Sequence, residues 1–151
     1  MALGQNDFER ALNERGKKDA PLMAERLLKR DIKIDAFVSS PARRAKKTAQ
    51  LFAKVYGCTE EDIILVTALY QAPKESFYDV VTLLNDQLDS VAIIAHNPGI
   101  TNFVNSLTSI VNLDNMPTCS VYAAQSNIFR WADFAKAKKE FLFFDYPKNV
   151  E

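Results

Sequence analysis

The spacing of apolar residues along the chain alternates between a helical period and short, uninterrupted runs. Helical spacing predicts helices over residues 14–30, 41–56, 77–88 and 100–111, with a short helical stretch near Trp131. Apolar runs of strand length predict strands over residues 36–38, 63–66, 91–95, 120–125 and 141–144. Because strands alternate with helices, we expect an α/β fold with a mostly parallel sheet and helices on both of its faces.

Single residues at the ends of these segments support the assignment. Asn13 is a good N-cap for the first helix, and Gly57 is expected to end the second one. Ser40 followed by Pro41 is typical of an N-cap and a first helical residue. The apolar run over residues 91–95 has no alternation, which predicts a strand that is buried on both faces.

Composition limits the classes of function. The 151 residues suit one domain, residues 1–151, and 19 basic against 19 acidic residues argue against a nucleic-acid binder. No apolar run approaches the roughly 20 residues that span a bilayer, and no signal peptide is visible, so we expect a cytoplasmic protein without a membrane partner. The chain has one histidine, and Cys58 and Cys119 lack metal-ligand spacing. We therefore expect no metal site built from histidines or cysteines.

His96 is the first candidate for chemistry. It follows the predicted strand over residues 91–95 and precedes a helix that is expected to start near Pro98 or Gly99. Ligands of parallel sheets bind beyond the carboxyl ends of the strands, and a helix N-terminus suits a phosphate. A histidine there can hydrogen-bond an anion or exchange a proton near neutral pH. The alternative is a hydrogen-bonded histidine at a strand end with no further role.

Arg44 is the second candidate. Residues 43–47 contain four basic side chains just after another predicted strand, and most of them are expected on a solvated helix face. At about 100° per residue, Arg43 and Lys47 point away from the apolar face of the helix, whereas Arg44 lies on its flank in the first turn. Its planar fork can give an anion two parallel hydrogen bonds. Ser39 and Ser40 are expected to cap the helix, Cys119 to be structural, and Tyr70 to lie in the core or in a pocket wall.

Six segments of the sequence match one known family in order. They are FERALNERGKKDAP (residues 8–21), SSPARRAKKTA (39–49), ALYQA (68–72), AHNPG (95–99), MPTCSVYA (116–123) and FFDYPK (143–148). Together they resemble the short bacterial phosphohistidine phosphatases of the SixA type, in the phosphoglycerate mutase-like histidine phosphatase superfamily. The resemblance implies a three-layer α/β/α sandwich and covers nearly the whole chain.

The resemblance also implies roles for individual residues. The family site uses two histidines and two arginines. The Ser-Ser-Pro-x-x-Arg-Ala motif places the second arginine at Arg44, and the Ala-His-Asn-Pro-Gly motif places the second histidine at His96. Asn97 is adjacent and is expected to help bind phosphate. The expected substrate is a phosphohistidine protein or a small phosphoester, which the family hydrolyses through a phosphohistidine enzyme intermediate. The resemblance implies neither a metal nor an organic cofactor.

One family motif is missing from this sequence. The nucleophilic histidine of the family lies in an Arg-His-Gly or Arg-His-Ala motif at the end of the first strand, and neither motif occurs here. We therefore expect an inactive chain and a sheet with either a gap or a borrowed strand. A misassigned start or a truncation, first residues dropped from the sequence, and a natural pseudo-phosphatase remain open explanations. The alternative function is a non-catalytic phosphate- or phosphoprotein-binding module.

Overall fold

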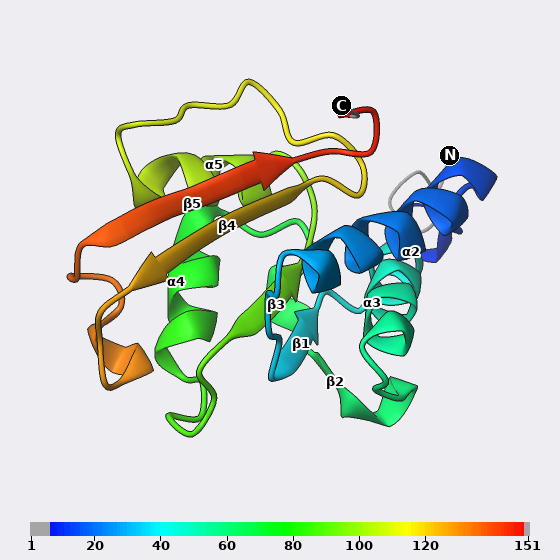
Figure 1. The fold of residues 1–151 in the computed structure, drawn as a ribbon. Helices are drawn as coiled ribbons and strands as arrows, with labels where there is room; N and C mark the ends of the chain where they lie inside the picture. The colour runs from blue at the N-terminus through cyan, green and yellow to red at the C-terminus, as the bar shows by residue number, and fades with distance from the viewer. Residues whose placement is uncertain (1–6, 150–151) are drawn as a thin grey trace.

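The computed structural model describes residues 7–149, in which helices and strands alternate as the sequence predicts (Figure 1). The α-helices are α2 (Glu14–Lys29), α3 (Arg43–Val55), α4 (Lys74–Thr82) and α5 (Gly99–Leu107), and residues 7–9 are also helical. The strands are β1 (Ala36–Ser39), β2 (Ile63–Leu65), β3 (Val91–Ile94), β4 (Val121–Ser126) and β5 (Lys139–Asp145). The short 3-10 helices are η1 (Glu60–Asp62), η2 (Thr67–Leu69) and η3 (Trp131–Asp133).

The predicted cap of α2 is confirmed, whereas that of α3 is wrong. The Asn13 side chain accepts a hydrogen bond from the Gly16 N–H at 2.8 Å, as an N-cap does. Helix α3 begins two residues later than predicted, with Ala42 as its N-cap. The fully buried Ser40 hydroxyl accepts the Ala42 N–H at 3.2 Å, which makes a tight turn before the helix. Ser40 therefore lies directly after β1 and does not cap α3.

Helices α4 and α5 are shorter than the apolar spacing predicts, because asparagine side chains turn the chain. After α4, Asn85 Oδ1 accepts the Gln87 N–H at 2.9 Å, which closes a turn instead of continuing the helix. Near the end of α5, Asn105 donates to the Leu113 carbonyl at 2.7 Å and accepts the Leu113 N–H at 2.8 Å. These two bonds bring the following segment back over the helix.

Strands β2, β1 and β3 form a parallel sheet in that order, with helices on both faces. Because successive strand residues point to opposite faces, Phe37 packs into the core under α2 and α3, whereas Val38 packs into the core under α4 and α5. In Figure 1, α2 and α3 lie together on one side of this sheet. The result is the expected three-layer α/β/α arrangement.

The expected gap in the sheet is present. Strands β4 and β5 form a separate antiparallel pair, and the described residues contain no strand between β3 and β4. Both sheets nevertheless share the same two cores. Ile93 and Tyr122 contribute to one core, and Ala92 and Val121 to the other. Strands β3 and β4 therefore both contribute residues to each of the two cores.

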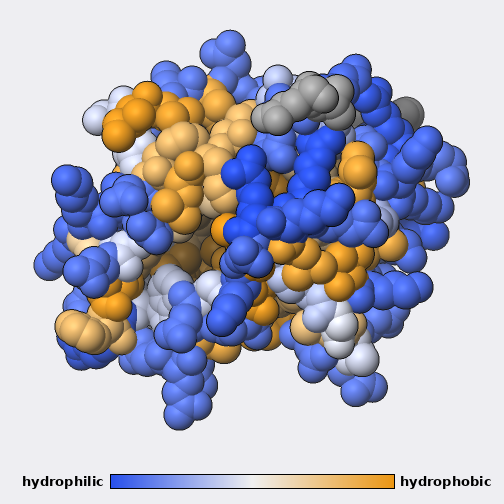
Figure 2. Space-filling model, in the orientation of Figure 1, coloured by the Kyte–Doolittle hydropathy of each residue, from blue (hydrophilic) through white to orange (hydrophobic). Residues whose placement is uncertain are grey.

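The prediction that β3 is buried on both faces is wrong, because one of its edges has no neighbouring strand within residues 7–149. All four residues of β1, which has neighbours on both sides, are buried, whereas all four residues of β3 are only half-buried. The strand pairs with β1 on one edge and exposes the other. The hydroxyl of Tyr122 on β4 is buried without a hydrogen-bond partner among the described residues. Figure 2 shows hydrophobic residues in a hollow of the surface beneath the β4–β5 pair.

Every helix within residues 7–149 is too short or too polar to cross a bilayer.

Candidate functional site

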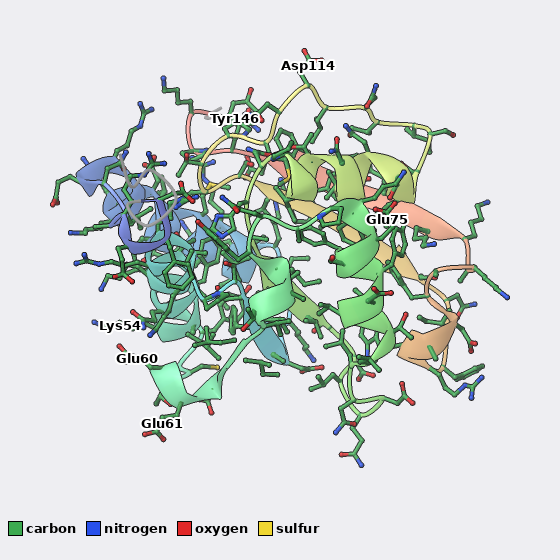
Figure 3. The ribbon with its side chains drawn as sticks, turned by 180° about the vertical axis from the view of Figure 1, so that it is seen from behind. Lys54, Glu60, Glu61, Glu75, Asp114 and Tyr146 are labelled. Atoms are coloured by element: carbon green, nitrogen blue, oxygen red, sulfur yellow. The ribbon has the colours of Figure 1, made fainter. Side chains whose placement is uncertain are left out.

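The carboxyl ends of β1 and β3 meet at one end of the molecule. The ladder continues past both strands, since the Ser40 N–H donates to the Ile94 carbonyl at 2.9 Å. Figure 3 shows Asp114 and Tyr146 at this end and Glu60 and Glu61, which precede β2, at the opposite one. Parallel α/β sheets bind ligands beyond this end of their strands.

His96 lies two residues past β3 and contacts the end of β1. Its Nε2 is 2.7 Å from the Ser40 hydroxyl. Because Ser40 already accepts the Ala42 N–H, its own proton is free to be donated to a neutral imidazole. Burial and the nearby charge of Arg44 lower the pKa of His96 to about 4, although Asp7 acts in the opposite direction. His96 is therefore neutral at physiological pH.

Arg44 projects from the first turn of α3 with its side chain 23% exposed. One guanidinium nitrogen donates to the Asp7 carbonyl at 2.7 Å, and the other lies 3.3 Å from Asp7 Oδ1. Arg43 and Lys47 are exposed, as the helical angles predict. The four basic residues therefore divide as expected, and Arg44 is the one that faces the strand ends.

Tyr70 and Asp7 complete the arrangement, although sequence reasoning assigned neither of them to the site. Tyr70 donates from its hydroxyl to Asp7 Oδ2 at 2.6 Å, and its ring lies edge-on to His96 with 5.6 Å between centroids. The Tyr70 hydroxyl and Arg44 lower the pKa of Asp7, and the Asp7 carboxylate raises that of Tyr70. Tyr70 follows β2, so the strand-end argument that selected His96 also applies to it. No sequence signal connects Asp7 to the site.

We call His96, Ser40, Tyr70, Asp7 and Arg44 the strand-end cluster. Hydrogen bonds and ring contacts connect these five residues, which come from segments far apart in the sequence. The structure thus brings Arg44 and His96 into one cluster at one end of the sheet. The cluster offers one fixed cation, one carboxylate, one neutral imidazole and two hydroxyl groups, and of these the cation, the imidazole and the hydroxyl groups suit an oxyanion.

Asn97 is adjacent in sequence but is engaged elsewhere. Its amide donates to the Met116 carbonyl at 2.9 Å, and its oxygen accepts from the Thr101 hydroxyl. That hydroxyl also accepts the Met116 N–H at 3.0 Å. In this structure the Asn97 side chain anchors the loop before Met116, while its role in phosphate binding stays a prediction. No group of three metal-ligating side chains is close enough to hold a metal ion within residues 7–149.

The depressed pKa of His96 gives a direct test of the cluster. Since the sequence contains one histidine, its ring resonances can be followed by NMR without ambiguity. We expect a titration midpoint near 4 rather than the ordinary 6.5. Arg44→Ala should raise the midpoint, because it removes a neighbouring positive charge. An ordinary midpoint in the unmodified chain would contradict the described burial of the imidazole.

The same shift makes stability depend on pH. The folded-state pKa of His96 lies below the ordinary value of 6.5, so the unfolded chain binds more protons between pH 4 and 6.5. The contribution of His96 to stability is therefore fully present above pH 6.5 and is lost as pH falls through this window. Urea unfolding at several pH values should show this slope, and His96→Gln should reduce it.

Part of the sequence and the fold as a whole are similar to known proteins. Residues 2–69 match the family model of the histidine phosphatase superfamily (branch 1). Among curated proteins, no sequence matches significantly. A putative phosphohistidine phosphatase SixA from Agrobacterium tumefaciens is 22% identical, with a TM-score of 0.74, over 97% of this chain and 90% of that one.

Two further solved structures are similar and contain phosphate-like anions. The protein histidine phosphatase SixA complexed with tungstate is 19% identical, with a TM-score of 0.80, over 96% of this chain and 89% of that one. A mycobacterial glucosyl-3-phosphoglycerate phosphatase complexed with VO3 is 20% identical, with a TM-score of 0.69, over 91% and 87% of the two chains. Residues 2–69 thus carry the sequence pattern of the histidine phosphatase superfamily, and the chain as a whole has the fold of SixA-type phosphatases.

Proposed function

We propose that this domain binds phosphoryl groups at the strand-end cluster, with Arg44 and His96 as ligands of the phosphoryl oxygens. The observation that carries the proposal is that both residues, which follow different strands, lie in one cluster beyond the sheet. Solved structures with this fold bind tungstate or VO3. Arg44 supplies a permanent charge and a planar donor fork, and His96 supplies a neutral ring nitrogen.

The reaction that suits these groups is hydrolysis through a phosphohistidine intermediate. A nucleophilic histidine divides the displacement into two steps, and the arginine and the second histidine stabilise charge on the transferred oxygens. His96 fits the stabilising role, because its Nε2 contacts Ser40 and its pKa is low. The substrate is a phosphohistidine protein or a small phosphoester.

We further propose that the 151-residue polypeptide binds phosphate without turning it over. His96 is the one histidine in this sequence, so the nucleophile of the two-step reaction has no candidate within it. This observation favours a second function, that of a non-catalytic phosphate- or phosphoprotein-binding module. The two functions share the anion site and differ in whether a phosphoenzyme forms.

Two neighbouring arginines provide a matched test of the anion site. We expect Arg44→Ala to weaken the binding of tungstate or inorganic phosphate by about 1.5–3 kcal/mol, because a charge-assisted pair is lost. Arg43→Ala removes the same charge from an exposed position one residue away and should leave affinity nearly unchanged. Isothermal titration calorimetry measures both. Equal losses in the two variants would contradict the proposed site.

A further inference from the structure

Two hydrogen-bond donors of the strand-end cluster converge on the carboxylate of Asp7. The Tyr70 hydroxyl donates to Oδ2 at 2.6 Å. One Arg44 guanidinium nitrogen lies 3.4 Å from the same oxygen and 3.3 Å from Oδ1. A positive guanidinium and a phenol that share one carboxylate form a binding position for an anion, and Asp7 occupies it.

The segment that carries Asp7 lies at the surface and is held by a few contacts, the shortest being the 2.7 Å hydrogen bond from Arg44 to the Asp7 carbonyl. Phe8 stacks edge-on against Tyr70 with 5.1 Å between centroids, and Arg43 donates to the Glu9 carbonyl at 3.4 Å. None of residues 7–10 is buried. The carboxylate can therefore leave Arg44 without opening either core of the domain.

A second partner is available to the carboxylate after it leaves. Arg10 lies 3.9 Å from Asp7 Oδ1, one helical turn along, and its side chain is 67% exposed. A displaced Asp7 can thus remain paired with Arg10 in solvent. The displacement separates the carboxylate from Arg44 and Tyr70 while its charge stays compensated.

We propose that Asp7 is an internal ligand of the phosphoryl-binding site, and that Tyr70 binds the oxyanion through its hydroxyl once Asp7 has left. This inference rests on the proposed function, because it assigns two more residues to the same site. An incoming oxyanion takes over the two donors that Asp7 now uses. Asp7 therefore sets the affinity of the site, and it selects anions that attract Arg44 more strongly than a carboxylate does.

The first test replaces the carboxylate by its neutral isostere. Asp7→Asn should tighten tungstate or inorganic phosphate binding by roughly 10-fold or more, because the competing charge is removed. Asp133→Asn is the matched control, since Asp133 forms a similar pair with Arg130 at 3.4 Å on the exposed surface of η3. The control makes the same change in net charge and should alter affinity less than 2-fold. Unchanged or weaker binding by Asp7→Asn would overturn the proposal.

The second test removes the phenol. In the Asp7→Asn background, Tyr70→Phe should weaken anion binding several-fold, because one donor to the oxyanion is lost. Tyr78→Phe is the control. The Tyr78 hydroxyl is also hydrogen-bonded, at 2.7 Å to the Ser106 hydroxyl, but Tyr78 lies on α4 and is not part of the strand-end cluster. Equal affinities with and without the Tyr70 hydroxyl would refute its role as a ligand.

A measurement on the unmodified chain does not depend on how the variants fold. The NMR chemical shift of the Asp7 carboxyl carbon should change when tungstate is added. The pKa of the Asp7 carboxyl group should rise, because Arg44 and Tyr70 no longer hold the carboxylate. Arg44-dependent tungstate binding without any change at Asp7 refutes the internal ligand but leaves the proposed function intact. Absence of anion binding in both the unmodified chain and Asp7→Asn refutes the proposed function itself.

Discussion

A chain extended at residue 1 by an apolar strand ending in Arg-His is expected to gain phosphatase activity, which we expect the 151-residue polypeptide not to have. The structure offers a place for such a strand. One edge of β3 and one edge of β4 have no partner among the described residues, and both strands contribute residues to the same two cores, one on each face of a strand that would lie in the space between them. An added strand with apolar residues on both faces would pair with β3 and fill this space.

The expected gain is large because a nucleophile acts only from a defined position. In-line displacement needs the attacking atom within about 3–3.5 Å of phosphorus, opposite the leaving group. A histidine at the carboxyl end of a strand beside β3 would lie near His96 and Arg44, the two residues that we propose as ligands of the phosphoryl oxygens. Removal of one member of such a cooperating set usually abolishes most of the rate, so we expect a gain of at least about 10³-fold.

A labelled phosphoryl donor measures this gain directly. The extended chain should acquire acid-labile, base-stable label, and the 151-residue polypeptide should acquire none. An extension ending in Arg-Asn is the matched control, since it can fill the gap without supplying a nucleophile. His96→Ala in the active chain should then lower turnover. Label that maps to His96 in the unextended chain would show that His96 attacks phosphorus and is not a helper.

Two residues of the strand-end cluster could be selected from the sequence. His96 and Arg44 each follow a short apolar run and precede a helix, a local pattern that a single sequence displays. The exposure of Arg43 follows from helical angles alone. Both predictions depend on neighbours in the sequence. The structure places the side chains of His96 and Arg44 beyond the strand ends, and their role in phosphate binding stays a prediction.

Asp7 and Ser40 could not be assigned in this way. The pairing of Asp7 with Arg44 spans 37 positions, and the contact of Ser40 with His96 spans 56. Such contacts depend on which strands are adjacent, and the local pattern of residues does not determine that. The same limit explains the error at β3, because its apolar run predicts full burial whether or not a second neighbouring strand is present.

The second large effect is expected in the core beneath α4 and α5. Phe77 on α4 is fully buried, and its ring stacks on that of Phe103 on α5, with 5.0 Å between centroids. A Cβ at Gly99 would meet the Ala72 backbone and approach the Phe77 ring, so this ring also lies against the helix start that follows His96. Phe77 thus supports both α5 and the segment that carries the site histidine.

Phe77→Ala is expected to lower the free energy of unfolding by about 3–5 kcal/mol, because it removes the buried ring and leaves a cavity. Folded domains have total stabilities of about 5–15 kcal/mol, so this change exceeds half of the stability at the low end of that range. Phe129→Ala is the matched control, since it replaces the same residue type by alanine at a position that is 96% exposed. Urea unfolding should show a much lower midpoint for Phe77→Ala and little change for Phe129→Ala. Equal midpoints for the two variants would mean that the packing of α4 on α5 does not hold this side of the sheet.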